Sequence, residues 1–226
     1  MDFSGNMLWL LVLLPAFLSA FSLVMPSSRA ALATVAIGVP ASAAVAAWAV
    51  VTVFRAGPLL SSGGWLHLDA LSAYHVVVMM VVFAMSSLYT IPYFRHEPAG
   101  HVLGLGSIRR FTALWHGSLG AMTLVLLSNN IGVMWVGVES TTLLTAFLIC
   151  VHVSPVSLEA TWKYLIVCSV GVAFAFMGVL LVAASVGHTS VDPYLLHWTN
   201  LRKIAGTLNP RLLKMAFIFL LVGYGT

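Results

Sequence analysis

Apolar and polar positions fall into long alternating blocks along the chain. Six apolar runs of helical length occupy residues 7–25, 30–54, 69–94, 110–127, 131–151 and 158–185. They lack the two-residue alternation of barrel strands, and each has close to the roughly 20 residues that a helix needs to cross a bilayer. The pattern predicts a polytopic bundle of membrane helices, with Pro40 as a kink in the second.

The last part of the sequence is less regular. Residues 188–210 form the longest connection, and apolar residues recur in it at the helical spacing typical of a short amphipathic helix in the headgroup region: Tyr194, Leu195, Trp198, Leu201 and Ile204. After Lys214 the apolar stretch 215–226 has only 12 residues. At about 1.5 Å per residue it covers roughly 18 Å of a hydrocarbon core about 30 Å thick. We expect a seventh helix to begin here and the chain to be a fragment of a longer protein.

Composition supports the membrane assignment. Of the 226 residues, 61% are hydrophobic and only 7% are charged, and the mean hydropathy is +1.03. About a quarter of the residues of a soluble domain are charged, so a water-soluble enzyme, a disordered segment and a nucleic-acid-binding domain are excluded. The ten Lys and Arg residues divide equally between the loops on the two sides of the membrane. In the early short loops, however, most of the Lys and Arg residues lie on one side. Because cytoplasmic loops are enriched in Lys and Arg, we expect the N-terminus outside.

Histidines and cysteines suggest metal or haem chemistry, but their positions argue against it. Cys150 and Cys168 are too few for an iron–sulfur cluster, and no Cys-x-x-Cys pair suits zinc. His75 and His116 could ligate haem only at a common depth. They lie on helices entering from opposite sides, and differ in depth by about 12 Å. We therefore expect packed histidines and no haem.

Ionisable groups inside the apolar runs are the strongest functional candidates. A charge at mid-membrane costs at least about 2.5–3.5 kcal/mol, so it needs a partner or a purpose. Glu139 lies near the middle of the fifth run, on one helical face with Trp135 and Thr142. Burial raises the pKa of a carboxyl and a nearby cation lowers it, so such a group can bind and release a proton. The alternative is a permanently protonated carboxyl with one interhelical hydrogen bond.

Lys163 lies about one turn into the sixth run, which follows the fifth after a short loop. Two interpretations of it remain open. Lys163 could communicate with Glu139 through one or two waters, or it could extend to the membrane surface and pair with Glu159 at i,i+4. His116 and His152 are further candidate members of a proton relay. The small residues Gly171, Ala175 and Gly178 form a stripe that predicts close helix packing.

Two segments carry a resemblance to a known family. Residues 128–142, which contain Met134-Trp135-Val136-Gly137-Val138-Glu139, and residues 157–165, Ser-Leu-Glu-Ala-Thr-Trp-Lys-Tyr-Leu, resemble the antiporter-like subunits of complex I. The resemblance is strongest to the hydrogenase-4/formate hydrogenlyase branch, which shares ancestry with Mrp-type cation/proton antiporters. It is strong from about residue 110 and generic before that.

The resemblance implies an all-α fold of about fourteen helices with inverted repeats, of which this chain supplies the first six to seven. It implies three N-terminal helices in 7–109 and a truncated first repeat in 110–226. By resemblance, Glu139 matches the family's glutamate on helix five and Lys163 its lysine on helix six. A further lysine is expected just beyond Thr226, at the break in helix seven.

The resemblance also implies a function. We expect an ion-translocating membrane subunit of a hydrogenase-4-like or complex-I-like pump that couples redox energy to proton or sodium movement. The alternatives are a subunit of a Mrp-type antiporter and a non-conducting membrane scaffold. We expect a prokaryotic cytoplasmic membrane location, no cofactor in this chain, no nucleic acid, and partners that are the other membrane and peripheral subunits, with redox chemistry in the peripheral ones.

Overall fold

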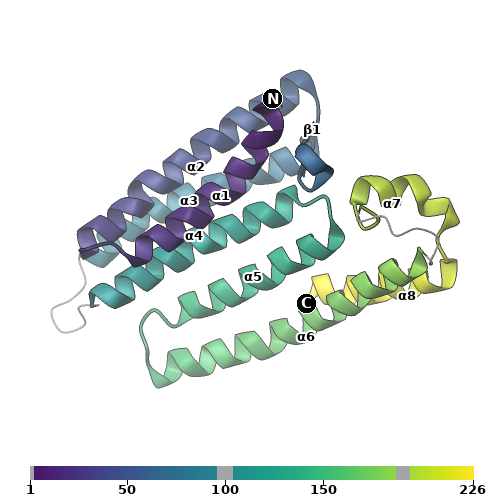
Figure 1. The fold of residues 1–226 in the computed structure, drawn as a ribbon. Coiled ribbons are helices and arrows are strands. Elements are labelled where there is room, and N and C mark those ends of the chain that lie inside the picture. The colour runs from purple at the N-terminus through teal and green to yellow at the C-terminus, as the bar shows by residue number, and fades with distance from the viewer. Residues whose placement is uncertain (1–2, 96–103, 187–193) are drawn as a thin grey trace.

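The computed structural model describes residues 3–95, 104–186 and 194–226, and they form a bundle of helices (Figure 1). The long helices are α1 (Phe3–Leu23), α2 (Ser28–Ala56), α3 (Ala70–Arg95), α4 (Leu105–Leu127), α5 (Ile131–Ile149), α6 (Pro155–Ser185) and α8 (Pro210–Gly225). The short helix α7 (Trp198–Ile204) confirms the amphipathic helix expected in the last connection. The all-α bundle is confirmed, and α2 continues through Pro40.

Polar side chains set where several helices begin. The Ser27 hydroxyl accepts a hydrogen bond from the backbone N–H of Ala30 at the start of α2. Asn130 accepts from Gly132 and Val133 at the start of α5. Ser154 and Ser157 form a reciprocal capping box at the start of α6. These caps satisfy N–H groups that the first turn of a helix leaves without a partner.

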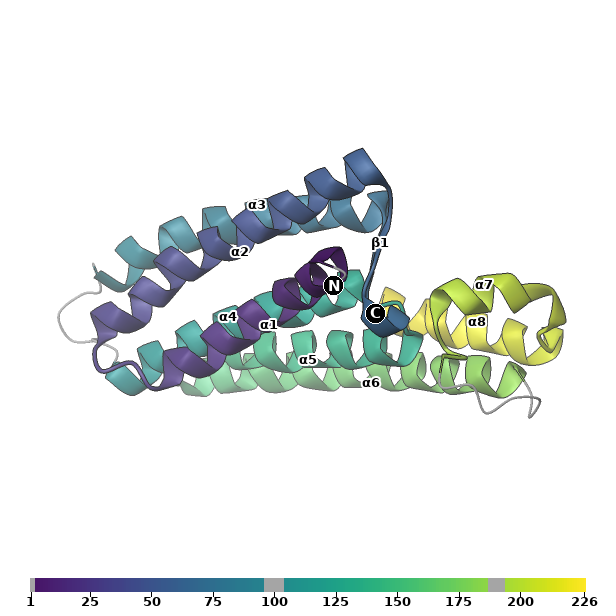
Figure 2. The same ribbon diagram turned by 45° about the horizontal axis from the view of Figure 1, so that its top comes forward.

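The helices stack in layers, which are clearest in Figure 2: α2 with α3, then α1 with α4, then α5 with α6. Helix α4 contacts α1, α2, α3 and α5, and α6 packs against both α5 and α8. The main core lies among α1, α2, α3 and α4, where the largest fully buried aliphatic side chains include Leu8, Leu11, Val35, Val39, Val76 and Leu119.

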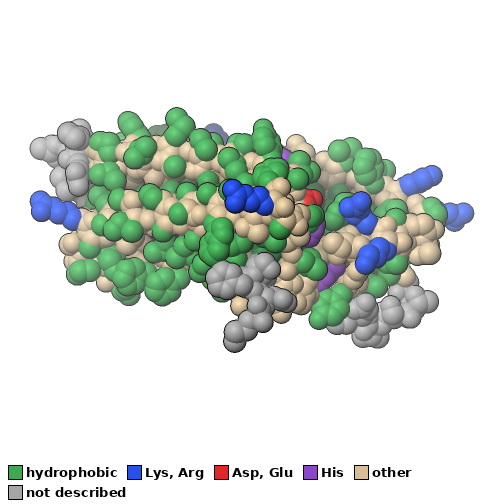
Figure 3. Space-filling view, turned by 90° about the horizontal axis from the view of Figure 1, so that it is seen from above, with side chains coloured by type: hydrophobic (Ala, Val, Ile, Leu, Met, Phe, Trp, Pro, Cys, Tyr) green, Lys and Arg blue, Asp and Glu red, His purple; other side chains and the backbone are tan. Residues whose placement is uncertain are grey.

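Five helices of the described part are long and apolar enough to cross a membrane: α1, α2, α3, α5 and α6. Six crossing runs were predicted, and the fourth differs. Helix α4 has the required length, but it carries Arg109 and Arg110 near its start and buries Thr112, His116 and Ser118 against its neighbours. Hydrophobic side chains cover much of the face in Figure 3, as expected for helices that contact lipid.

Three connections meet at one end of the bundle through Asn129. A small hairpin pairs β1 (Leu59–Leu60) with β2 (His67–Leu68) around the 3-10 turn η1 (Ser62–Gly64). The Asn129 side chain donates to the Gly64 carbonyl (2.7 Å) and to the Thr199 hydroxyl (3.0 Å). Its backbone N–H donates to the Trp65 carbonyl. The α4–α5 turn is thereby bonded to both the hairpin and α7.

Candidate functional site

Glu139 lies in the middle of α5, eight residues after its first residue Ile131 and ten before its last, Ile149. Its side chain is half-buried. Oxygen Oε2 is fully buried and has no hydrogen-bond partner among the described residues. A buried carboxyl oxygen without a partner is costly unless the group is protonated or contacts water. The structure therefore places a carboxyl oxygen without a partner among the described residues at the centre of a membrane helix.

Two hydrogen bonds between α5 and α6 bracket Glu139. On one side, the Trp135 indole N–H donates to the Val172 carbonyl at 2.9 Å. On the other, the hydroxyls of Thr145 and Tyr164 are 3.0 Å apart. Because antiparallel helices rise equally per residue, interpolation between these bonds puts Glu139 at the level of Ser169 on α6. Glu139 thus lies at the α5–α6 contact, well away from the loop that joins the two helices.

Lys163 does not contact Glu139. Its Nζ atom lies 2.5 Å from Glu159 Oε1, and the side chains of the two residues are 73% and 64% exposed. The next residue, Tyr164, bonds to α5. Successive side chains on a helix point about 100° apart, so Lys163 faces away from this contact. Of the two interpretations that the sequence leaves open, the structure contains the i,i+4 pair with Glu159.

His116 is buried at the centre of the bundle of α1, α2 and α4. It is fully buried, and neither ring nitrogen makes a hydrogen bond of normal geometry. The backbone of Thr34 on α2 is a polar group that acts on the ring. Gly38 of α2 leaves the space for it, since a Cβ atom there would lie 2.8 Å from His116 Cε1. His116 packs against α2, and among the described residues no hydrogen bond joins it to Glu139.

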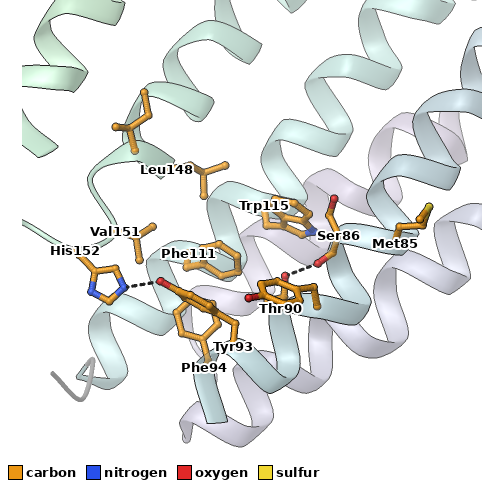
Figure 4. Close-up of a pocket in the computed structure, with 12 residues that line it drawn as sticks. Met85, Ser86, Thr90, Tyr93, Phe94, Phe111, Trp115, Leu148, Val151 and His152 are labelled. Atoms are coloured by element: carbon orange, nitrogen blue, oxygen red, sulfur yellow. Dashed lines mark hydrogen bonds between the residues drawn. The ribbon is translucent and has the colours of Figure 1, made fainter. Parts of the chain in front are cut away.

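His152 lies in the α5–α6 loop and contacts α3. Its Nε2 atom is 3.3 Å from the Tyr93 hydroxyl (Figure 4). The pair stands at one side of a cavity of about 690 Å³, with Phe111 and Trp115 of α4 on another side. His152 is therefore at the loop end of α5, while Glu139 is three turns deeper.

His75 and His116 lie at different depths, as expected. His75 borders the same cavity as Leu126, and Leu126 is ten residues along α4 from His116. Ten residues of helix correspond to roughly 15 Å. Within the described ranges no group of three or more His, Cys, Asp or Glu residues could hold a metal ion. The absence of haem stays a prediction.

Sequence reasoning missed the polar groups that join α5 to α6. Besides the Thr145–Tyr164 contact, the Cys150 thiol lies 2.7 Å from the Thr161 hydroxyl. The available signal was the spacing, since Thr142 and Thr145, and Thr161 and Tyr164, are each three residues apart and share a helix side. The stripe of Gly171, Ala175 and Gly178 is confirmed as a packing face against α8.

Comparison with known proteins finds a sequence relative of this chain that is named as a hydrogenase-4 component homolog. No family model matches this chain. It is 36% identical over 166 residues to the "Hydrogenase-4 component F homolog" of Methylacidiphilum infernorum (isolate V4). The aligned residues cover 73% of this chain and 35% of that protein. The chain thus spans about a third of the length of this curated relative. The match supports the resemblance to the hydrogenase-4 branch.

Solved structures show the same fold at lower identity. A chain of the membrane-bound sulfane sulfur reductase, an archaeal respiratory membrane complex, superposes with a TM-score of 0.78 at 22% identity, over 96% of this chain and 43% of that one. A chain of respiratory complex I from Thermus thermophilus gives a TM-score of 0.66 at 20% identity, over 97% and 43%. Both likenesses concern the fold.

Proposed function

We propose that this chain, a sequence relative of a hydrogenase-4 component F homolog with the fold of an antiporter-like membrane subunit, belongs to a redox-driven ion pump. In this proposal the intact subunit moves protons, or sodium, across the membrane. The energy comes from electron transfer in partner subunits of a hydrogenase-4-like or complex-I-like assembly. The multi-pass helical fold and the sequence match to a component of such a system support it.

The buried carboxyl of Glu139 carries the proposal. Its charged form costs at least about 2.5–3.5 kcal/mol in mid-span, so retention of the group needs a reason. The unpartnered oxygen Oε2 shows no structural use of the carboxyl within the described residues. A carboxyl of this kind can hold a proton when its surroundings are apolar, and release it when a cation or water approaches. Glu139 is therefore our proposed proton-binding residue.

Lys163 is the proposed charge partner, acting without direct contact. Its pair with Glu159 is exposed, and exposed pairs contribute only about 0–1 kcal/mol, so the lysine is readily released from it. We further propose a prokaryotic cytoplasmic membrane location with the N-terminus outside, no cofactor in this chain, and redox centres in peripheral partners. His116 and His152 remain proposed relay residues on other parts of the bundle.

A double-variant experiment tests the proposed pair. Glu139→Gln and Lys163→Ala in the assembled complex should each abolish redox-driven proton uptake into proteoliposomes, and the double variant should be no worse than either. Such non-additivity is expected of residues that act as one unit. Electron transfer should survive at least partly, because no redox centre is changed. Normal uptake in Lys163→Ala would remove Lys163 from the site, and normal uptake in all three would favour the scaffold.

A further inference from the structure

A row of hydroxyl and thiol groups follows the α5–α6 contact from Glu139 to the loop that joins the two helices. Its members are Thr142, Thr145, Tyr164, Thr161 and Cys150. Cys150 follows Glu139 by eleven residues and comes directly after the end of α5, which corresponds to roughly 16 Å along the helix axis. The row therefore covers the whole distance from the centre of α5 to its loop end.

The inner part of the row lies on α5. Glu139 and Thr142 are three residues apart, as are Thr142 and Thr145, so each pair is separated by about 4.5 Å along the axis and shares a helix side. The Thr145 hydroxyl lies 3.1 Å from the Thr142 carbonyl. It also lies 3.0 Å from the Tyr164 hydroxyl, so the row continues from α5 onto α6 at this point.

The outer part runs along α6 and returns to α5. Thr161 is buried and lies three residues before Tyr164. Its hydroxyl is 2.7 Å from the Cys150 thiol, and the thiol is also 3.4 Å from the Ser157 carbonyl. Two close approaches between protonatable side chains, Thr145–Tyr164 and Cys150–Thr161, thus lie about one turn apart along the α5–α6 interface.

The outer end of the row opens into a cavity. Cys150 borders a space of about 380 Å³ together with Ser19, Ser107 and Arg110. Arg110 is exposed and lies in the first turns of α4, so this space is polar on one side. The Cys150 thiol therefore connects the row to a region that water can enter.

We propose that this row conducts protons between the cavity at the α5–α6 loop and Glu139. The inference rests on the proposed function of Glu139. In each transfer a hydroxyl receives a proton on its oxygen and gives its own proton to the next oxygen, so no group keeps a net charge. Successive members are three residues apart on one helix at three places, Glu139–Thr142, Thr142–Thr145 and Thr161–Tyr164, and one water at each would complete the row. Glu139 accepts the proton as a carboxylate and becomes neutral.

A packing role alone explains less of the geometry. Threonine hydroxyls in membrane helices commonly bond the carbonyl of the preceding turn, as Thr142 does with Val138 and Thr145 with Thr141. That role needs neither the Tyr164 hydroxyl nor the Cys150 thiol. The proton row accounts for both, and it ends at a buried carboxyl oxygen that has no partner in the described chain.

Removing single oxygens tests the row. Thr145→Val and Tyr164→Phe in the assembled complex should each slow proton uptake into proteoliposomes at least about tenfold. The double variant should be no slower than the slower single variant, and Thr145→Ser should restore the rate because it keeps the hydroxyl. Thr141→Val is the matched control: its hydroxyl bonds the carbonyl of Gly137, which packs on α4, so uptake should change by less than about twofold.

The outcomes separate the row from the function of Glu139. Wild-type uptake in Thr145→Val and Tyr164→Phe, with uptake lost in Glu139→Gln, would overturn the row and leave the proposed function standing. Uptake intact in Glu139→Gln would overturn the proposed function itself. An equal loss in Thr141→Val and Thr145→Val, or no recovery in Thr145→Ser, would also contradict the row, because the defect would then follow packing and not the hydroxyl.

Discussion

The sequence indicates that Glu139 is important, but it does not indicate which groups surround it. A carboxyl in an apolar run is costly wherever its neighbours lie, so the sequence alone predicts a functional role for it. The direction of Lys163 could not, because its spacing suits both Glu159 and a deeper partner. The Tyr164 contact with α5 fixes the rotation of α6 at this level, and the exposed pair with Glu159 shows that Lys163 points outward.

His116 could be found from the sequence as an ionisable residue in an apolar run, but the space that holds it could not. That space comes from Gly38 on another helix, where an added Cβ would also meet the Leu18 side chain at 2.6 Å. The partner of a buried residue depends on which helices pack together. The apolar periodicity of one helix does not contain that information.

Gly38→Ala should lower the stability of the fold. The new methyl group would overlap the His116 ring and Leu18, and overpacking typically costs about 1–3 kcal/mol. Thermal unfolding of the purified protein in detergent, followed by circular dichroism, measures the change. Gly106→Ala is the control, because nothing lies within 4 Å of its added Cβ. Equal midpoints for the two variants would show that the space beside His116 is not tight.

Element positions were largely predictable because each membrane helix is an almost continuous apolar run. The fifth run, 131–151, corresponds to α5 at Ile131–Ile149, and the sixth run, 158–185, corresponds to α6 at Pro155–Ser185. The hairpin around η1 lies between the second and third apolar runs, where the apolar pattern predicts no membrane helix. Its strands are two residues long, and bonds to Asn129 on a distant connection help to hold it.

The contact of α8 with α6 depends on one small residue. A Cβ atom at Gly223 would collide with the backbone of Ala175, and α8 could then no longer lie flat on α6. Gly223→Ala should therefore separate the two helices and destabilise the fold by about 1–3 kcal/mol. Gly225→Ala, two residues along the same helix with open space around it, should be neutral.

Chemical denaturation in detergent, followed by tryptophan fluorescence, can compare the two variants. A cysteine pair placed across α6 and α8 would report separation directly, by slower disulfide formation in Gly223→Ala. Unchanged denaturation and unchanged cross-linking in Gly223→Ala would contradict the assigned close approach.

The layered arrangement of the whole molecule could not be read from the apolar pattern. Hydropathy gives the number and length of helices, but the order of packing depends on contacts between distant segments, such as α1 against α4. Sequence resemblance supplied what the pattern lacked, and the fold shared with chains of two respiratory complexes agrees with it. The polar α4 lies at the centre of these layers, which explains why its composition is the least typical of a membrane helix.

The number of protons moved per electron, measured in proteoliposomes that contain the assembled complex, tests the role of Glu139 most directly. Glu139→Gln removes the proton-binding carboxyl and retains its size, and Glu159→Gln is the matched control on an exposed carboxyl. We predict that Glu139→Gln reduces the ratio to the background of protein-free vesicles while electron transfer continues, and that Glu159→Gln keeps the wild-type ratio. A wild-type ratio in well-assembled Glu139→Gln would contradict the assignment of Glu139 as the proton-binding residue.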